Sequence, residues 1–186
     1  FSIATAPEEE RRDLELHVRS SEDNPSSLEV MAALTDNETI DVRLPGGERY
    51  IDAVPQQPVW LICGSTGFAP AKAMIEHLRA RGFRRPLRLF WGARTREDLY
   101  LDELARDWAA EIPDFDYIPV LSEEHAAGYR SGTACEAALE FLPAAEMPLV
   151  HVAGSPAMAW ATFDALVAAG VPEYLIHSDV FDYAPR

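Results

Sequence analysis

Between residue 58 and the end of the chain, short apolar runs alternate with longer segments of helical periodicity. The first of these runs, residues 59–63, is continuously apolar, as expected of a strand that is buried on both faces of a parallel sheet. Repetition of strand and helix predicts an open parallel sheet with right-handed crossovers and helices on both faces. We therefore expect an α/β fold in the last two-thirds of the chain. The five expected strands cover residues 59–63, 87–91, 115–121, 149–153 and 174–177.

Four helices are expected between these strands. Gly82 marks the end of the first, because glycine readily adopts the left-handed conformation in which many helices end. Thr95 and Asp98 resemble a capping box at the start of the second, and Ser155 with Pro156 predicts the start of the fourth. The expected helices cover residues 69–81, 95–108, 132–142 and 156–170.

The first third of the chain has a different pattern, in which apolar and polar residues alternate singly. Such alternation predicts strands with one buried face, as in an antiparallel barrel or sandwich, but too few of them to close one. The expected elements are strands over 1–6, 13–18 and 39–44, a helix over 25–34 and a turn over 45–47. We expect two domains, residues 1–54 and residues 55–186.

The chain carries a formal net charge of −15 over 186 residues. A chain this acidic lacks the basic face that nucleic acid or an anionic membrane would require, so neither is expected as a partner. No apolar run reaches the roughly eighteen residues of a membrane span, and no signal peptide is visible. Cys63 and Cys135 lack metal-binding spacing and predict free thiols in a reducing cytoplasm, with no metal site. Because the first residue is not Met, we expect the chain to start inside a larger gene product.

Small residues and glycines follow four of the expected strands. Backbone amides in such turns can approach a phosphate closely, and the N-terminus of the following helix adds partial positive charge. Ligands of open parallel sheets bind at this edge. Each turn alone is also explained by tight packing, and Arg94 by a pair with Glu97 or Asp98. The four turns are Gly64 to Pro70, Gly92 to Arg94, Leu121 to Glu124 and Ala153 to Met158.

Taken in order along the chain, these turns resemble the ferredoxin–NADP reductase superfamily, and most of all the bacterial NAD(P)H–flavin reductases. Phe1 and Ser2 also look like the end of the family's flavin-binding motif. The motif's arginine and the barrel strands before it are not in the chain. The resemblance implies an NAD(P)-binding domain preceded by part of a flavin-binding β-barrel. It rests on the sequences GSTGFAP at 64–70, FWGAR at 90–94, DLY at 98–100, GSPAM at 154–158 and SDVF at 178–181.

The resemblance further implies an oxidoreductase that transfers a hydride from a nicotinamide coenzyme to a flavin, FAD or FMN. Phe1 would lie against the flavin ring. Ser2 would hydrogen-bond the flavin near the atom that accepts the hydride, which makes Ser2 the candidate catalytic residue. His17, Val18 and Arg19 would contact the flavin as well. The alternatives are an ordinary strand start for Phe1 and Ser2, and a solvated strand residue for His17.

By the same resemblance, the dinucleotide would lie on the turns at the strand ends. Asp179 and Phe181 would lie beside the nicotinamide, where an aromatic side chain can cover the flavin; the alternative is a tail that packs on the core. The expected dinucleotide-binding residues are Gly64, Ser65, Thr66, Gly67 and Arg94 at the phosphates, and Gly154, Ser155, Pro156 and Met158 at the nicotinamide side.

Coenzyme choice is expected to depend on the turn after residue 121. NADP-preferring relatives place a Ser–Arg pair and a further basic residue there to bind the 2′-phosphate, whereas this chain has Ser122, Glu123 and Glu124. A carboxylate repels a phosphate and suits a ribose diol. Arg130 is the residue best able to compensate. We therefore expect NADH, with NADPH as the alternative.

Two other functions fit the same residues. One is the reductase component of an oxygenase or of a deoxysugar pathway, with an electron-acceptor protein as a further partner. The other is a non-catalytic module that binds NAD(H) without turnover.

Overall fold

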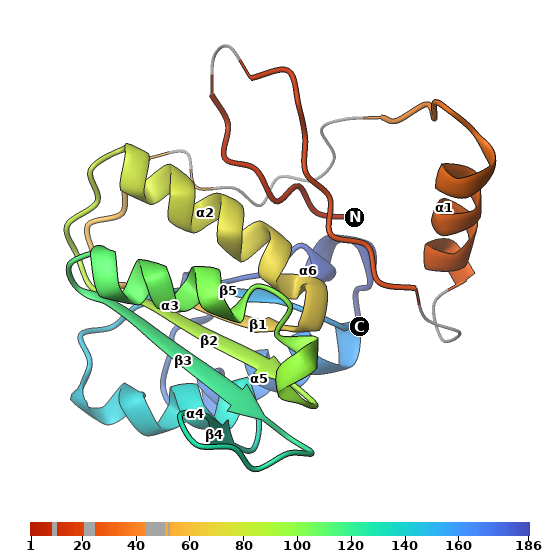
Figure 1. Ribbon diagram of the computed structural model, residues 1–186. Helices are drawn as coiled ribbons and strands as arrows, with labels where there is room; N and C mark the ends of the chain where they lie inside the picture. Colours follow the sequence, from red (N-terminus) through yellow and green to blue (C-terminus); the bar gives the residue numbers. More distant parts are fainter. Residues whose placement is uncertain (9–10, 21–24, 44–50, 52) are drawn as a thin grey trace.

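A parallel sheet crosses the middle of the molecule (Figure 1). The computed structural model describes residues 1–8, 11–20, 25–43, 51 and 53–186. Within these residues the sheet has six strands in the order β4-β3-β2-β1-β5-β6, and every neighbouring pair is parallel. The strands are Val59–Gly64 (β1), Leu87–Ala93 (β2), Phe115–Leu121 (β3), Arg130–Ser131 (β4), Leu149–Ala153 (β5) and Ile176–His177 (β6).

The predicted parallel α/β sheet is confirmed, but it has six strands rather than five. The additional strand, β4, has only two residues, which pair with Val120 and Leu121 of β3. Both residues of β4 are exposed, so no apolar run marks this strand in the sequence. β6 is shorter than predicted, because Glu173–Leu175 form a 3-10 turn before it.

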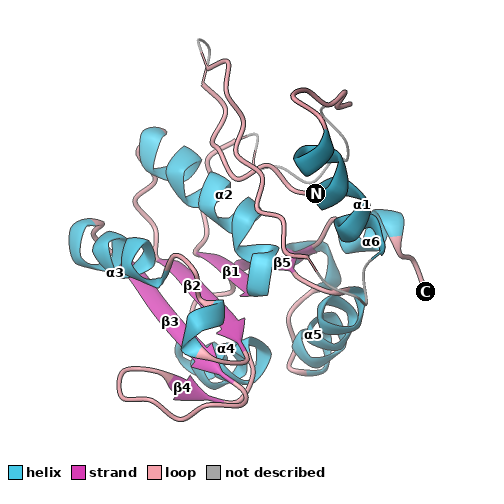
Figure 2. Ribbon diagram, turned by 45° about the vertical axis from the view of Figure 1, so that its right-hand side comes forward, coloured by secondary structure: helices cyan, strands magenta, loops and turns pink. Residues whose placement is uncertain are grey.

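Helices cover both faces of the sheet (Figures 1 and 2). The helices of the described residues are Pro25–Asp36 (α1), Phe68–Ala80 (α2), Asp102–Glu111 (α3), Ala134–Phe141 (α4), Pro156–Ala168 (α5) and Val180–Tyr183 (α6). The two hydrophobic clusters of the core place α2 and α3 on one face and α4 and α5 on the other. In the described part of the chain, no helix is long and apolar enough to cross a membrane.

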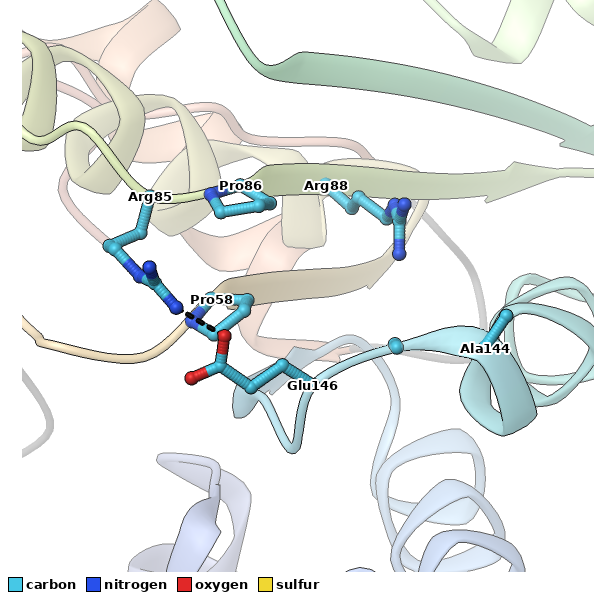
Figure 3. Close-up of a pocket in the computed structure, with 7 residues that line it drawn as sticks. Pro58, Arg85, Pro86, Arg88, Ala144 and Glu146 are labelled. Atoms are coloured by element: carbon cyan, nitrogen blue, oxygen red, sulfur yellow. Dashed lines mark hydrogen bonds and ion pairs between the residues drawn. The ribbon is translucent and has the colours of Figure 1, made fainter.

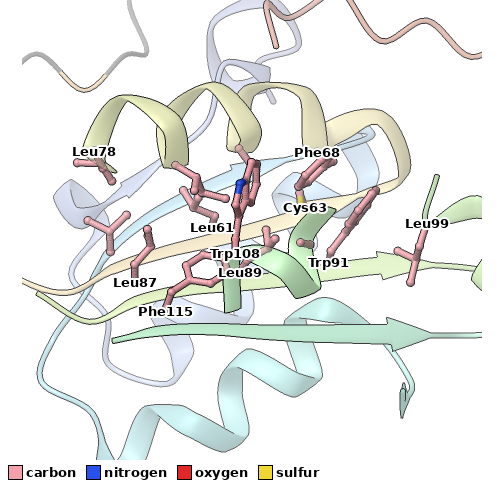
Figure 4. Packing of buried hydrophobic residues seen from close by; sticks show 14 of the residues in the cluster. Leu61, Cys63, Phe68, Leu78, Leu87, Leu89, Trp91, Leu99, Trp108 and Phe115 are labelled. Carbon is pink, nitrogen blue, oxygen red and sulfur yellow. The ribbon is translucent and has the colours of Figure 1, made fainter. Parts of the chain in front are cut away.

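Successive residues of β1 face opposite sides of the sheet and build these two clusters. Cys63 faces α2 and α3, whereas Trp60 faces α4 and α5. On the first face, Phe68 at the start of α2 stacks on Trp91 of β2, with ring centroids 3.9 Å apart and an angle of 10° between the rings (Figure 4). Full burial of a side chain such as Phe68 contributes about 1.5–3 kcal/mol. The stack therefore anchors the first turn of α2 on the sheet.

Two helix ends follow the predicted signals. α2 ends at Ala80, and Gly82 adopts a φ of +71° just beyond it. At the start of α5, the Ser155 hydroxyl accepts a hydrogen bond from the Met158 amide at 3.3 Å, and Pro156 occupies the first position of the helix.

The predicted capping box at Thr95 is wrong. Arg96–Asp98 form a separate 3-10 turn, and Thr95 makes no capping hydrogen bond with its side chain. Leu99 then has a non-helical ψ of 63°, so α3 begins only at Asp102. A capping box is present instead at the start of α4, between Thr133 and Glu136.

The first two predicted strands are not formed. Residues 1–6 and 13–18 run antiparallel, but the only strand-type pairing between them is an isolated bridge between Ile3 and Leu16. Two strands alone are at best marginally stable without a third strand or a packed face. The segment therefore lies on the molecule as an extended chain.

The rest of the first third is partly as predicted. The helix expected over 25–34 is confirmed as α1. Residues 39–43 form no strand, because Ile40 and Val42 are exposed and no described strand lies beside them. Residue 44 and the predicted turn over 45–47 lie outside the described residues. The antiparallel flavin barrel before the sheet thus stays a prediction.

Candidate functional site

The order of the sheet reverses at β1. The chain adds β2, β3 and β4 on one side of β1 and then crosses to add β5 and β6 on the other. In open parallel sheets, the crevice for ligands forms at such a reversal, beyond the carboxyl ends of the strands. Gly64 ends β1 and Gly154 follows β5, so the first and last of the predicted phosphate turns border this crevice.

Packing requires the glycine at the end of the first turn. A Cβ atom on Gly67 would lie 2.2 Å from the carbonyl oxygen of Ala153, at the end of β5. A Cβ atom on Gly64 or on Gly154 would lie 2.6 Å from the sulfur of Met158, which is the movable end of a side chain. Met158 therefore covers the junction of the two turns. Gly67 has a structural role, backbone contact with β5, in addition to the predicted approach of a phosphate.

Ser65 adopts a left-handed backbone conformation, with a φ of 51°. This conformation costs a non-glycine residue about 1–2 kcal/mol. The Nε1 of Trp91 donates a hydrogen bond of 2.9 Å to the carbonyl oxygen of Ser65, and Trp91 is fully buried. A buried indole N–H needs an acceptor, so the same hydrogen bond satisfies Trp91 and holds the turn in its unusual shape.

The first turn leads directly into α2. Ser65, Thr66 and Gly67 form a 3-10 turn that runs directly into α2, and the Phe68 amide at the start of α2 donates to the carbonyl oxygens of Ser65 and Thr66. Amides at a helix N-terminus carry partial positive charge and attract anions, and Pro70 has no amide hydrogen to satisfy. This helix start is suited to an anionic group such as a pyrophosphate. The start of α5 differs, because the Ser155 hydroxyl is already used as its cap.

Arg19 connects the N-terminal segment (the described residues 1–8 and 11–20) to the glycine turn at the end of β1. Its Nη1 donates to the Ser65 hydroxyl at 3.1 Å, and its Nη2 pairs with an Asp98 carboxylate oxygen at 3.1 Å. The other oxygen of Asp98 lies 3.6 Å from Nε of Arg94. Two arginines predicted to bind cofactors thus share one carboxylate, and the expected alternative for Arg94, a pair with Asp98, is present.

His17 lies between a carboxylate and a tyrosine. Its Nε2 is 2.8 Å from Glu15, and its Nδ1 is 2.6 Å from the hydroxyl of Tyr100. A carboxylate only accepts, so in the neutral ring Nε2 carries the hydrogen and Nδ1 accepts from Tyr100. Partial burial raises the pKa of Tyr100, which keeps its hydroxyl protonated. His17 is only 8% exposed, so the alternative of a solvated strand residue is wrong; Val18 beside it is half-buried.

The first and last segments of the chain meet. The Ser2 hydroxyl donates a long hydrogen bond of 3.4 Å to Asp179, just before α6. Phe1 is 59% exposed, so much of its ring remains accessible. Phe181 instead packs on Trp160, with ring centroids 4.4 Å apart. Phe181 therefore follows the alternative expectation, in which the C-terminal tail packs on the core.

The turn after β3 lies against the turn after β2. The Ser122 amide donates to the Ala93 carbonyl oxygen at 3.0 Å, and the Glu123 amide donates to the Arg94 carbonyl oxygen at 3.0 Å. The Glu123 side chain is exposed at this edge. Backbone bonds thus fix the position from which Glu123 projects.

Nearby arginines are engaged with carboxylates. Glu124 accepts a hydrogen bond of 2.9 Å from the backbone amide of Arg96 and also lies 3.4 Å from its guanidinium. Arg130, the residue expected to compensate for the acidic pair, forms an ion pair with Glu140 on α4.

Asp102 fixes the loop between β3 and β4. The hydroxyls of Tyr117 and Tyr129 each donate to its carboxylate at 2.7 Å, and Nε of Arg106 donates at 2.8 Å. Burial alone would raise the pKa of Asp102, but these three donors hold that pKa below its ordinary value. The loop that begins with Ser122 is therefore anchored through Tyr129 close to its far end.

Four residues that shape this site were missed in the sequence analysis: Trp91, Tyr100, Asp102, and Lys72 of α2, whose ammonium group contacts the Ala4 carbonyl oxygen and the Glu15 carboxylate. Trp91 gave a usable signal, since a tryptophan at the end of a buried strand needs an acceptor for its N–H. Lys72 gave another, as a lysine on the apolar face of a helix. The partners of Tyr100 and Asp102 come from distant segments, and no sequence pattern identifies them.

The cavity drawn in Figure 3 lies at the opposite edge of the sheet. It has a volume of about 220 Å³, and Pro58, Pro86 and Arg88, near the starts of β1 and β2, line it. Arg85 and Glu146 form an ion pair at its rim (Figure 3). None of the predicted site residues lines it.

Among the residues that the structure describes, no group of three or more His, Cys, Asp or Glu side chains is placed to hold a metal ion.

Comparison with known proteins agrees with this geometry. Residues 61–163 match the family described as the oxidoreductase NAD-binding domain. An NAD(P)H-flavin reductase from Vibrio harveyi is 31% identical over 166 residues, which cover 87% of this chain and 70% of that protein. Reductase component 2 of terephthalate 1,2-dioxygenase from Comamonas sp is 29% identical over 100% of this chain and 55% of its own length. A CDP-6-deoxy-L-threo-D-glycero-4-hexulose-3-dehydrase reductase from Yersinia pestis is 30% identical over 97% of this chain and 54% of its own length. The chain thus spans about half the length of the last two relatives.

Among solved structures, a ferredoxin NADP+ reductase from Neisseria gonorrhoeae with bound FAD and NADP has a TM-score of 0.74 to this chain. The two share 18% sequence identity, over 96% of this chain and 77% of that one, so the likeness is one of fold. The family match covers more than half of the 186 residues and includes the turns at the end of β1, β2, β3 and β5. The chain belongs to the oxidoreductase NAD-binding domain family and is a relative of the NAD(P)H-flavin reductases.

Proposed function

We propose that the chain aligns NADH with a flavin and so promotes hydride transfer between them. The observation that carries this proposal is the contact of Arg19 with Ser65, which brings the N-terminal segment to the glycine turn at the end of β1. The segment holds the candidate flavin contacts, and the turn holds the candidate phosphate contacts. A bound flavin would supply the hydride acceptor, and the protein's contribution is to orient the two rings and exclude water.

The described residues fit both groups. The turn from Gly64 to Gly67 presents the start of α2 to an anion such as the pyrophosphate of a dinucleotide. Phe1 offers an exposed aromatic face of the kind that stacks on a flat ring. Ser2 would exchange its long hydrogen bond to Asp179 for one to the flavin. In this arrangement Ser2 steadies the flavin at the reacting edge.

NADH is the proposed coenzyme because the turn after β3 carries the exposed Glu123 at the position where NADP-preferring relatives place a basic residue. A carboxylate there can accept a hydrogen bond from a ribose hydroxyl and repels a phosphate. The neighbouring arginines already have carboxylate partners, which lowers their capacity to bind a phosphate. These pairs are Arg94 with Asp98, Arg96 with Glu124, and Arg130 with Glu140.

The test is steady-state oxidation of NADH and of NADPH by the chain with added FMN or FAD, followed by the loss of reduced-nicotinamide absorbance. We expect saturable turnover, with a higher kcat/KM for NADH than for NADPH. Binding of NADH in calorimetry without any turnover would overturn the proposal and favour a non-catalytic nucleotide-binding module.

A second candidate function is that of a reductase component that delivers electrons to a partner protein. The similarity to the terephthalate dioxygenase reductase and to the deoxyhexulose dehydrase reductase favours it. The two candidates differ in how they hold the flavin. Flavin that stays with the protein through gel filtration favours the reductase component, whereas flavin that exchanges freely and shows a KM of its own favours a flavin reductase.

We also propose that residues 1–54 belong to a flavin-binding domain and residues 55–186 form the nucleotide-binding domain. The change from an extended segment with a single bridge to a six-stranded sheet supports this division. Limited proteolysis tests it: cleavage between residues 51 and 58 should precede any cleavage within the sheet.

A further inference from the structure

Lys72 is a buried lysine in the second turn of α2. Its side chain is 10% exposed, and its ammonium group contacts three oxygens. These are the Ala4 carbonyl oxygen at 3.1 Å, a Glu15 carboxylate oxygen at 2.9 Å and a Glu76 carboxylate oxygen at 2.9 Å. An ammonium group has three hydrogens to donate, so each has an acceptor. A buried charge is tolerated when it is paired and hydrogen-bonded in this way.

The three acceptors belong to three separate stretches of chain. Glu76 lies one turn further along α2, while Ala4 and Glu15 lie on the two antiparallel stretches of the N-terminal segment. The Ala4 amide also donates to the Glu15 carbonyl oxygen at 2.8 Å, which joins the two stretches directly. The Ala6 amide makes a longer hydrogen bond of 3.4 Å to Glu76. Lys72 thus holds both stretches of the segment on one helix.

The same contacts continue to the candidate flavin residues. The second carboxylate oxygen of Glu15 contacts His17, which in turn contacts Tyr100 after β2. Ser2 lies two residues before Ala4 in the chain. A shift of the segment on α2 would therefore displace Ser2 and His17 together.

We propose that Lys72 is a positioning residue for hydride transfer: it docks the segment that carries Phe1 and Ser2 on the helix whose first turn receives the coenzyme. This inference rests on the proposed function. The glycine turn leads into α2 at Phe68, and Lys72 follows one turn later. One rigid helix therefore fixes the position of the segment that carries Phe1 and Ser2 relative to the glycine turn that would bind the coenzyme. Misplacement of reacting groups by about 1 Å can cost about 100-fold in rate.

The experiment compares the wild-type chain with Lys72→Met, which keeps much of the side-chain length and removes the charge. Arg79→Met is the matched control, because Arg79 lies on the same helix in an exposed pair with Glu111. We expect hydrogen–deuterium exchange of the Ala4 and Ala6 amides to be at least about tenfold faster in Lys72→Met and unchanged in the control. We expect kcat with NADH and flavin to fall by about 10- to 100-fold, while KM for NADH changes by less than about threefold.

Wild-type exchange and wild-type kcat in Lys72→Met would overturn the inference, and so would faster exchange with an unchanged kcat. A wild-type chain without turnover would instead overturn the proposed function, and the exchange data would still decide whether Lys72 docks the segment. If Lys72→Met does not fold, Glu15→Gln removes one charged acceptor and leaves the other two contacts. Its exchange and kcat should change in the same direction by a smaller factor.

Discussion

The indole of Trp91 donates a hydrogen bond of 2.9 Å to the carbonyl oxygen of Ser65, a residue in a left-handed conformation. Trp91 belongs to β2 and is buried in the core, where Phe68 stacks on it. A core residue of one strand thus determines the shape of the turn that ends the neighbouring strand. The shape of the candidate phosphate turn, Gly64 to Gly67, therefore depends on Trp91 in the core as well as on the turn's own residues.

Replacing Trp91 with Phe should weaken coenzyme binding more than it affects turnover. The variant retains an aromatic ring under Phe68 but loses the hydrogen bond to Ser65. A hydrogen bond of this kind contributes about 0.5–1.5 kcal/mol, which corresponds to about two- to tenfold in KM for NADH. Steady-state kinetics measures the change. Trp108→Phe, another buried tryptophan of the same cluster, should lower stability and leave KM unchanged; equal effects in both variants would contradict the role of Trp91.

Glu123→Arg should shift coenzyme preference toward NADPH. The wild-type carboxylate would lose a hydrogen bond to the ribose and gain a repulsion when a 2′-phosphate is present, together about 1–3 kcal/mol. That difference corresponds to about 5- to 160-fold in the ratio of kcat/KM values. The measurement is kcat/KM for both coenzymes in wild type and variant. Equal wild-type values, or a variant that gains nothing with NADPH, would show that another part of the site sets the choice.

Gly67→Ala should destabilise the chain, because the added Cβ atom would lie 2.2 Å from the Ala153 carbonyl oxygen. Forcing extra atoms into a packed site typically costs about 1–3 kcal/mol in free energy of unfolding. Denaturant unfolding measures the loss. Gly64→Ala is the control in the same turn, since its Cβ atom would meet only the movable sulfur of Met158. A control that loses as much as Gly67→Ala would argue against backbone contact as the cause.

Asp102 should contribute to stability at neutral pH and lose that contribution in acid. Its pKa in the folded chain is below the ordinary value, through the donors Tyr117, Tyr129 and Arg106, although burial opposes this shift. Above the unfolded pKa of about 3.9, both states are ionised and the full contribution is present. As the pH falls further, the unfolded chain takes up the proton first, and the contribution declines through the lower folded pKa.

The measurement is urea unfolding of wild type and Asp102→Asn at a series of pH values. The difference in free energy of unfolding should be constant from about pH 7 to pH 5 and shrink below about pH 4. A difference that stays constant into acid would contradict the assigned donors.

The sheet was largely predictable from the sequence because burial on both faces excludes polar residues from its central strands. The run from Val59 to Cys63 predicts β1 for this reason, since all five of its residues are buried and apolar. β4 was not predictable, since its two residues are exposed and their strand character comes only from pairing with β3. Residues 13–18 show the converse case: apolar and polar residues alternate there, but a single bridge to residues 1–6 does not make a strand.

The location of the candidate site was predictable for a similar reason. Glycine turns that follow parallel strands must gather at one edge, and the turns around Gly64 and Gly154 do so. What the sequence could not predict is which charged groups pair. Arg19 reaches Asp98 across 79 positions of the chain, and Lys72 reaches Glu15 across 57. Such pairs depend on how distant segments are placed in the fold, and the spacing of residues in the sequence does not predict that placement.

The central position of β1 also has a consequence for synthesis of the protein. β1 spans residues 59–64, and its partners are β2 at 87–93 and β5 at 149–153. Pairing between distant segments forms later than local pairing, and a nascent chain folds as its N-terminal part emerges. Translation therefore delivers β1, β2 and β3 with α2 and α3 well before Ala153, the residue against which Gly67 packs, has left the ribosome. We expect nascent chains stalled before residue 149 to have begun building the sheet and to have no measurable affinity for NADH.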